Sequence, residues 1–172
     1  MKKAIVLLLV LYCTGHQFVK AAEPEAMESL KGAVLCEANP FDTLRNLTKH
    51  GSSQWSKGFV GADFGEGMSH TNVLILKKPL IISGSSTFSI IGELEGSNYG
   101  FPGLVYGIFR GDFNKAVKEL GLVKVDSGHG TYSRSSGKDL DGDPDSLCPK
   151  TIYLTPKEGN EFLLGCGWCN GG

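Results

Sequence analysis

The chain has 172 residues, of which 17 are Lys or Arg and 18 are Asp or Glu. It carries no basic cluster, and so lacks the electrostatic pattern that binding to a phosphate backbone requires. We therefore do not expect a nucleic acid as a partner. The length suits one domain with one core, and no shift in composition marks a linker.

The first 21 residues have the order of an export signal. Lys2 and Lys3 precede the largely apolar segment 4–13, and a cleavage pattern of small residues ends at Ala21. This apolar segment is about half as long as the roughly 20 residues that span a bilayer, so we expect cleavage after Ala21 and no membrane anchor. A lipoprotein modified at Cys13 is an alternative, although Tyr12 is not the small residue that lipidation favours at the preceding position. Processing would remove three lysines and no acid, which leaves 14 basic and 18 acidic residues and a formal charge of −4.

Residues 22–172 predict a single α+β domain, mostly antiparallel sheet with two short helices packed on it. The stretch 23–28 is acidic and poor in apolar residues, so we expect it to be loosely ordered. A helix is predicted over 40–49, where Leu44 and Leu47 share a face. A second is predicted over 112–120, because Asp112 can cap its start and Gly121 can end it.

Strands are predicted where short runs rich in Val, Ile, Phe and Tyr alternate with turn residues. The sequence contains 24 glycines, spread along the chain, which supply many of these turns. Trp55, Phe59 and Phe64 are expected in the core. The unit 104–125 reads as strand, helix and strand, with a helix near the lower length limit for a parallel crossover. The predicted strands are 58–64, 71–77, 87–95, 104–110, 122–125, 151–154 and 161–166.

Four cysteines remain after processing, an even number that favours two disulfides in an exported chain. A hairpin turn centred on residues 158–159 would place Cys148 opposite Cys169, which leaves Cys36 to pair with Cys166. A bulge would undo this register. The main alternative joins Cys166 to Cys169 and Cys36 to Cys148.

The pair Cys166 and Cys169 also has the spacing of a redox motif. Thioredoxin-like proteins place such a motif at the start of a helix, which lowers the pKa of the first thiol. Only three residues follow Cys169, too few to build a helix. A structural role is therefore favoured, with thiol–disulfide exchange as an alternative function. A zinc site made of the four cysteines is disfavoured in an exported chain.

A long polar segment contains the candidate binding residues. Residues 127–137 are rich in glycine and serine, and long irregular segments in a compact domain are often functional. Tyrosine and arginine are enriched at interface hot spots, and a histidine between two glycines can approach a partner closely. The candidates here are His129, Tyr132 and Arg134.

Four carboxylates follow at alternate positions and form an acidic rim able to meet a basic partner. They are Asp139, Asp141, Asp143 and Asp145. Calcium binding is an alternative, but the spacing does not match an EF-hand, whose glycine and final acid would fall on Pro144 and Lys150. An exposed loop whose residue types favour turns is the simpler interpretation.

No assembled catalytic set is recognisable, so we expect no enzyme and no cofactor. His50 and His70 are expected at the surface, and nothing in their spacing predicts a zinc site with His129. The profile suits a periplasmic or secreted protein that acts by binding a protein partner. The leading hypothesis, by analogy of class, is an inhibitor or immunity protein directed against an enzyme that acts on the cell wall.

Overall fold

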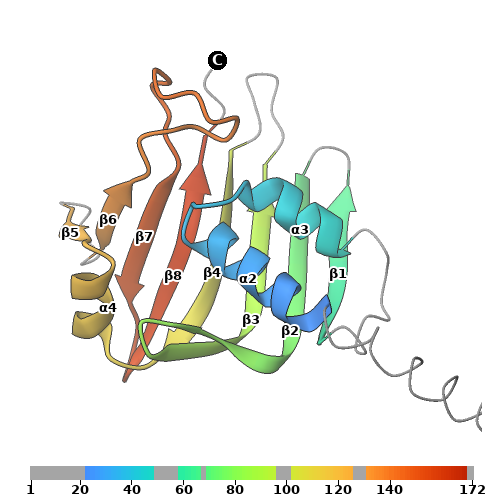
Figure 1. Cartoon of the computed structure of the whole chain (residues 1–172), viewed down its shortest axis with the longest axis horizontal. Helices are drawn as coiled ribbons and strands as arrows, with labels where there is room; N and C mark the ends of the chain where they lie inside the picture. The colour runs from blue at the N-terminus through green and yellow to red at the C-terminus, as the bar shows by residue number, and fades with distance from the viewer. Residues whose placement is uncertain (1–21, 49–57, 67–68, 96–101, 126–130, 170–172) are drawn as a thin grey trace, which may run out of the picture.

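The computed structural model describes residues 22–48, 58–66, 69–95, 102–125 and 131–169, and it confirms the α+β class. All strand pairs are antiparallel, and the sheet has the order β1-β2-β3-β4-β8-β7-β6-β5 (Figure 1). The described helices are α2 (Ala22–Val34), α3 (Pro40–Thr48) and α4 (Phe113–Glu119). The strands are β1 (Phe59–Glu66), β2 (Ser69–Ile82), β3 (Ser85–Leu94), β4 (Gly103–Arg110), β5 (Val123–Lys124), β6 (Tyr132–Ser135), β7 (Thr151–Pro156) and β8 (Glu161–Trp168).

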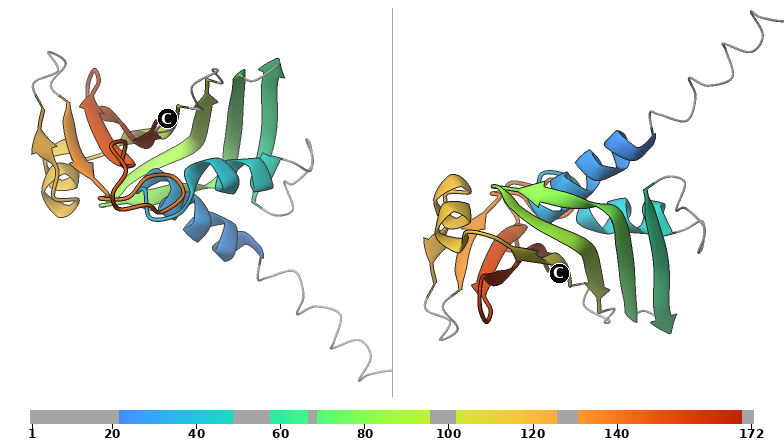
Figure 2. Two further views of the ribbon diagram at one scale, coloured as in Figure 1. Left: turned by 90° about the horizontal axis from the view of Figure 1, so that it is seen from above. Right: turned by 90° about the horizontal axis from the view of Figure 1, so that it is seen from below.

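The three helices lie on the same face of the sheet (Figure 2). Because side chains alternate along a strand, every second residue points to the helices. Leu74, Val105 and Leu164 point to the helices and are fully buried. Leu30 of α2 and Leu44 of α3 pack in the same core. The inner face of the sheet therefore carries the core of the described part of the chain.

No helix of the described chain lies on the opposite side of the sheet, which we call the open face. One row of directly paired residues crosses this face over all eight strands. It contains Ala62, Val73, Ile91, Tyr106, Gly165, Tyr153, Ser133 and Val123. Phe64 lies beside this row and is 64 % exposed, so its predicted place in the core is wrong. Phe59 is buried as predicted, and Trp55 lies outside the described residues.

The helix α2 corrects the expectation that residues 23–28 are loosely ordered. Leu30, Ala33 and Val34 are fully buried and anchor its second half to the sheet. Proline is well tolerated in the first turn of a helix, so Pro24 does not prevent α2 from starting at Ala22. The described residues therefore form one helix more than the sequence predicts.

The predicted helix at 112–120 is confirmed as α4. Asp112 caps it by accepting a hydrogen bond from the Lys115 amide at 2.9 Å, and Gly121 follows it with a φ of 62°. The chain then continues to β5 at the far edge, with the three strands β8, β7 and β6 between it and β4. Phe113 holds α4 on the inner face through edge-on contacts with Tyr132 and Phe162, at centroid distances of 5.5 and 5.9 Å.

The two disulfides have the pairing that the sequence favours. Cys36 bonds to Cys166 and Cys148 to Cys169, with Cα–Cα distances of 5.2 and 5.7 Å. The hairpin register behind that prediction is wrong by one residue, because Thr151 pairs with Gly167. The predicted disulfide pairing is nevertheless correct, because Cys148 lies before the first residue of β7 and its position is not fixed by the strand pairing.

Candidate binding surface

The segment that joins β6 to β7 carries the predicted acidic residues, and its base is fixed by backbone hydrogen bonds. The Ser136 amide donates to the Lys150 carbonyl, and the Lys150 amide donates to the Lys138 carbonyl, both at 2.8 Å. The Cys148–Cys169 disulfide ties the same end of the loop to the residue that follows β8. The loop therefore leaves the sheet from a closed base.

The carboxylate of Asp139 organises the loop from inside. It accepts hydrogen bonds from the amides of Asp141 at 3.0 Å and Asp143 at 2.8 Å. The Asp143 carboxylate in turn accepts from the Asp145 amide at 2.9 Å. The hydrogen bond from the Asp143 amide is the main cause that lowers the pKa of Asp139. These turns are the local structures that aspartate favours in loops.

The loop lies over the connection between α2 and α3 (Figures 1 and 2). The Asn39 side-chain amide donates to the Leu140 carbonyl at 3.4 Å, and Leu140 packs against the core. Glu37 and Asp42 stand on either side of Asn39 along the chain, and both are exposed. The structure thus adds two acids to those that the sequence indicates. The acidic surface then comprises Glu37, Asp42, Asp139, Asp141, Asp143 and Asp145.

One large apolar residue stands beside these acids. Leu147 is fully exposed and directly precedes Cys148, whose disulfide to Cys169 anchors the loop. Its exposure is not predicted from the sequence, because a leucine next to a cysteine is more often a core residue. An exposed leucine on a fixed loop is the kind of anchor that a partner can cover.

The other predicted binding residues differ in their surroundings. Tyr132 and Arg134 belong to β6, so part of the segment expected to be irregular is a strand. Tyr132 is half-buried against Phe113, whereas Arg134 is exposed close to the start of the acidic loop. His129 lies outside the described residues. Of the three, Arg134 is the one that the structure places at the exposed surface, on the strand that leads into the acidic loop.

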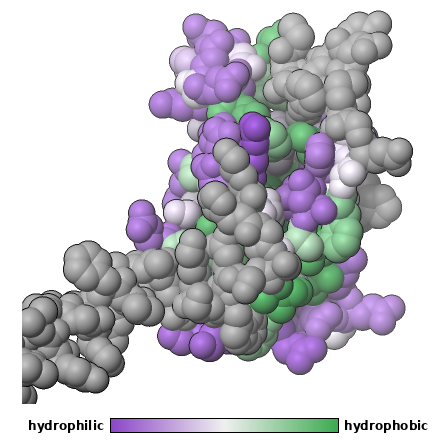
Figure 3. Space-filling view, turned by 90° about the vertical axis from the view of Figure 1, so that its right-hand side faces the viewer, coloured by the Kyte–Doolittle hydropathy of each residue, from purple (hydrophilic) through white to green (hydrophobic). Residues whose placement is uncertain are grey.

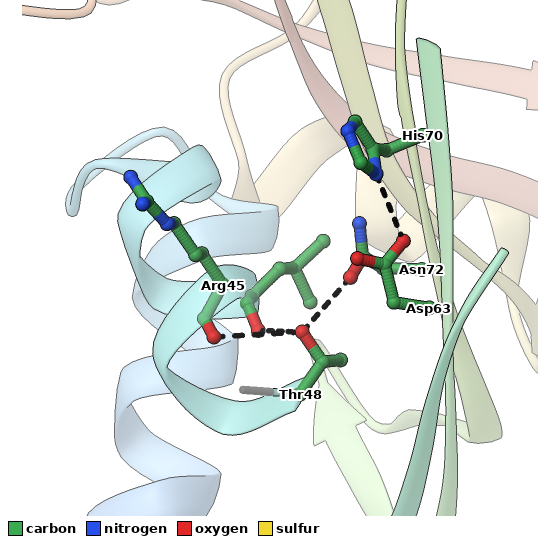
Figure 4. Close-up of polar contacts among 6 residues, drawn as sticks. Arg45, Thr48, Asp63, His70 and Asn72 are labelled. Atoms are coloured by element: carbon green, nitrogen blue, oxygen red, sulfur yellow. Dashed lines mark hydrogen bonds and ion pairs between the residues drawn. The ribbon is translucent and has the colours of Figure 1, made fainter. Parts of the chain in front are cut away.

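A second polar cluster, not predicted from the sequence, lies at the end of α3 (Figure 4). The buried Thr48 hydroxyl lies 2.9 Å from both the Leu44 carbonyl and the Asn72 side-chain oxygen. Nearby, His70 Nδ1 lies 3.2 Å from Asp63 Oδ1. A histidine–carboxylate pair can support catalysis when a nucleophile faces it, but the Thr48 hydroxyl is buried and bonded to backbone. The cluster therefore fixes α3 to β2, and His50 lies outside the described residues.

The described residues contain no group of three or more His, Cys, Asp or Glu side chains placed to hold a metal ion. The four aspartates of the loop are included in that statement, so the calcium alternative gains no support from their arrangement. Cys166 and Cys169 are bonded to different partners rather than to each other, which gives the redox alternative no support either. Within the same described ranges, no helix combines the length and the apolar character needed to cross a membrane.

Comparison with protein-family models, with curated proteins and with solved structures finds no match for this chain.

Proposed function

We propose that this protein is exported and acts by binding a basic protein partner through its acidic surface. The observation that carries the proposal is the fully exposed Leu147 at the end of an acidic loop whose base is closed. An apolar anchor surrounded by charged residues is the usual organisation of a protein interface. Two disulfides support the export, because such bonds persist in oxidising compartments.

Fixing the loop favours affinity. A flexible loop loses conformational entropy when a partner orders it, at about 0.5–1.5 kcal/mol for each immobilised side chain. Here the carboxylates of Asp139 and Asp143 already hold the backbone of the turns by hydrogen bonds. The loop therefore loses less conformational entropy when a partner binds. Asp141, Asp145 and Leu147 are exposed and remain available to a partner.

The class of partner follows from the charge. An acidic surface raises the association rate with a basic partner and repels acidic ones. Enzymes that act on the anionic polymers of a cell wall present basic surfaces to their substrates. We therefore propose an inhibitor or immunity protein in the periplasm or outside the cell, which covers such an enzyme with its acidic loop.

The test compares partner recovery by three forms of the oxidised protein from a periplasmic extract. The test variant combines Asp141→Asn, Asp145→Asn and Leu147→Ser, which remove charge and the anchor but leave Asp139 in place. The control combines Glu119→Gln, Glu158→Gln and Val123→Ser, which remove equal charge and one exposed apolar residue elsewhere.

We expect wild type and control to recover the same basic enzyme in stoichiometric amount and to lower its activity. The test variant should lose at least ten-fold in affinity, and the wild-type affinity should fall as salt is raised. Equal recovery by the folded test variant would exclude the acidic loop as the binding site. Absence of any partner for the wild type would contradict the proposed function itself.

A further inference from the structure

The open face carries large apolar side chains that no described element covers. Ile75 on β2, Ile108 on β4 and Tyr153 on β7 are 46 %, 41 % and 38 % exposed. Their registers place all three on the side away from the helices. Viewed from the β1 edge, hydrophobic residues lie exposed among polar ones (Figure 3). A broad apolar face on one side of a sheet marks an interaction surface.

We propose that the open face packs against the same face of a second copy of this chain, which makes the protein a homodimer. Two sheets that pack face to face keep their strands within about 30° of each other and form a layer about 10 Å thick. A two-fold axis through the central row would bring identical surfaces together. The apolar side chains of both copies would then lie in one buried layer.

The size of the face fits this occupant. Six neighbouring strands, from β1 to β7 in the order of the sheet, have at least six residues each. At about 4.8 Å between strands and about 3.4 Å per residue over eight residues, they cover about 800 Å². A stable protein–protein interface buries about 800 Å² on each partner. The open face is therefore as large as a dimer of this kind needs.

The charges of the face also favour a second copy. Glu93 accepts a hydrogen bond from the Tyr106 hydroxyl at 2.9 Å, and Arg110 pairs with Glu161 at 2.7 Å. Each of these three charges already has a partner within the chain, so these three would not form a cluster of like charges when identical faces meet. A strongly basic or acidic partner would find no concentrated counter-charge here, in contrast to the acidic surface. The open face and the acidic surface therefore differ in chemical character and suit different partners.

The experiment measures the mass of the oxidised protein by sedimentation equilibrium. The test variant combines Ile75→Glu and Ile108→Glu, which place four carboxylates in the proposed dimer layer. Both positions are nearly half exposed, so the fold should tolerate the change, and Ile75→Thr with Ile108→Thr serves as a milder variant. Leu147→Glu is the matched control, because it adds a carboxylate at an exposed apolar residue outside the open face.

We expect wild type and Leu147→Glu to sediment at twice the chain mass and the double glutamate variant at the chain mass, with an unchanged melting temperature. The threonine variant should show a weaker dimer. A monomeric wild type would overturn the proposal, and so would a dimer that persists in the folded glutamate variant. A wild-type monomer that sediments with lipid vesicles, or that needs Ile75 and Ile108 to bind the partner protein, would assign the face to that other occupant.

Discussion

Replacing Cys36 and Cys166 by alanine should destabilise the fold more than replacing Cys148 and Cys169, although each change removes one disulfide. A disulfide reduces the entropy of the unfolded chain by an amount that grows with the logarithm of the loop it closes. The two loops span 130 and 21 residues. The chain-entropy relation then gives about 5 kcal/mol for the first bond and about 3 kcal/mol for the second.

The surroundings of the two bonds increase this difference. Cys36 and Cys166 are buried in the core, so their replacement also removes packing contacts. Cys169 is exposed, and its partner lies at the base of a surface loop. The two loops closed by the disulfides overlap in the sequence. When the Cys148–Cys169 bond is kept, it shortens the chain path between Cys36 and Cys166 only slightly. The entropy contribution of the Cys36–Cys166 bond depends on the logarithm of that length and therefore changes little.

Equilibrium unfolding in urea measures both costs on the oxidised variants. With a slope of about 2 kcal/mol per molar urea, the two midpoints should differ by about 1 M. Peptide mapping without reduction should recover the Cys36–Cys166 and Cys148–Cys169 links in the wild type. An equal or larger loss on removing Cys148 and Cys169, or a recovered Cys166–Cys169 peptide, would refute the reasoning.

Three further changes test single interactions. Thr48→Val should cost about 1–2 kcal/mol in urea unfolding, because it removes a buried hydroxyl that links α3 to β2. The folded-state pKa of Tyr106 is raised to about 12 by burial and by Glu93, so Glu93→Gln should lower it in an absorbance titration but leave it above 10.0. Because this raised pKa favours the neutral phenol, its stabilising contribution is complete below pH 10.0 and is lost as the pH rises towards about 12. Asp139→Ala should lower the protection of the Asp143 amide against hydrogen exchange, relative to its intrinsic rate, and acid should lower this protection too as the pH falls through the lowered folded-state pKa of Asp139.

Conservative variants serve as controls for these three changes. Thr48→Ser should recover most of the lost stability, and Asp139→Asn should protect the amide better than alanine does, because both keep an oxygen in place. A Tyr106 pKa unchanged by Glu93→Gln would show that burial alone raises it. Hydrogen exchange at Asp143 that is insensitive to Asp139→Ala would contradict the role of that carboxylate in holding the loop.

Most of the strands could be predicted because runs rich in β-branched and aromatic residues alternate with turn residues along the chain. Helix α4 was predictable from its cap at Asp112 and its stop at Gly121. Helix α2 was not, since Leu30, Ala33 and Val34 lie in its second half, after an acidic start. Strand β6 was missed because a short polar strand has no apolar alternation.

The acidic surface was only partly predictable. The aspartates of the loop stand out by their spacing, but the contact that seats the loop joins residues 101 positions apart, Asn39 and Leu140. No local pattern encodes such a contact, so the contribution of Glu37 and Asp42 could not be foreseen. The exposure of Leu147 likewise depends on the direction in which the fixed loop leaves the sheet.

The position of β8 in the sheet has a consequence for when the protein can fold. The strands β1 to β4 and the strands β7 to β5 are joined through β8, which follows all of them along the chain. Both disulfides also need a cysteine from β8 or the residue after it. The two halves of the sheet could therefore meet only after synthesis had passed β8. Contacts between residues so far apart in sequence form slowly, and for a chain exported as proposed above, that delay would keep the polypeptide in the extended state that a translocation channel accepts.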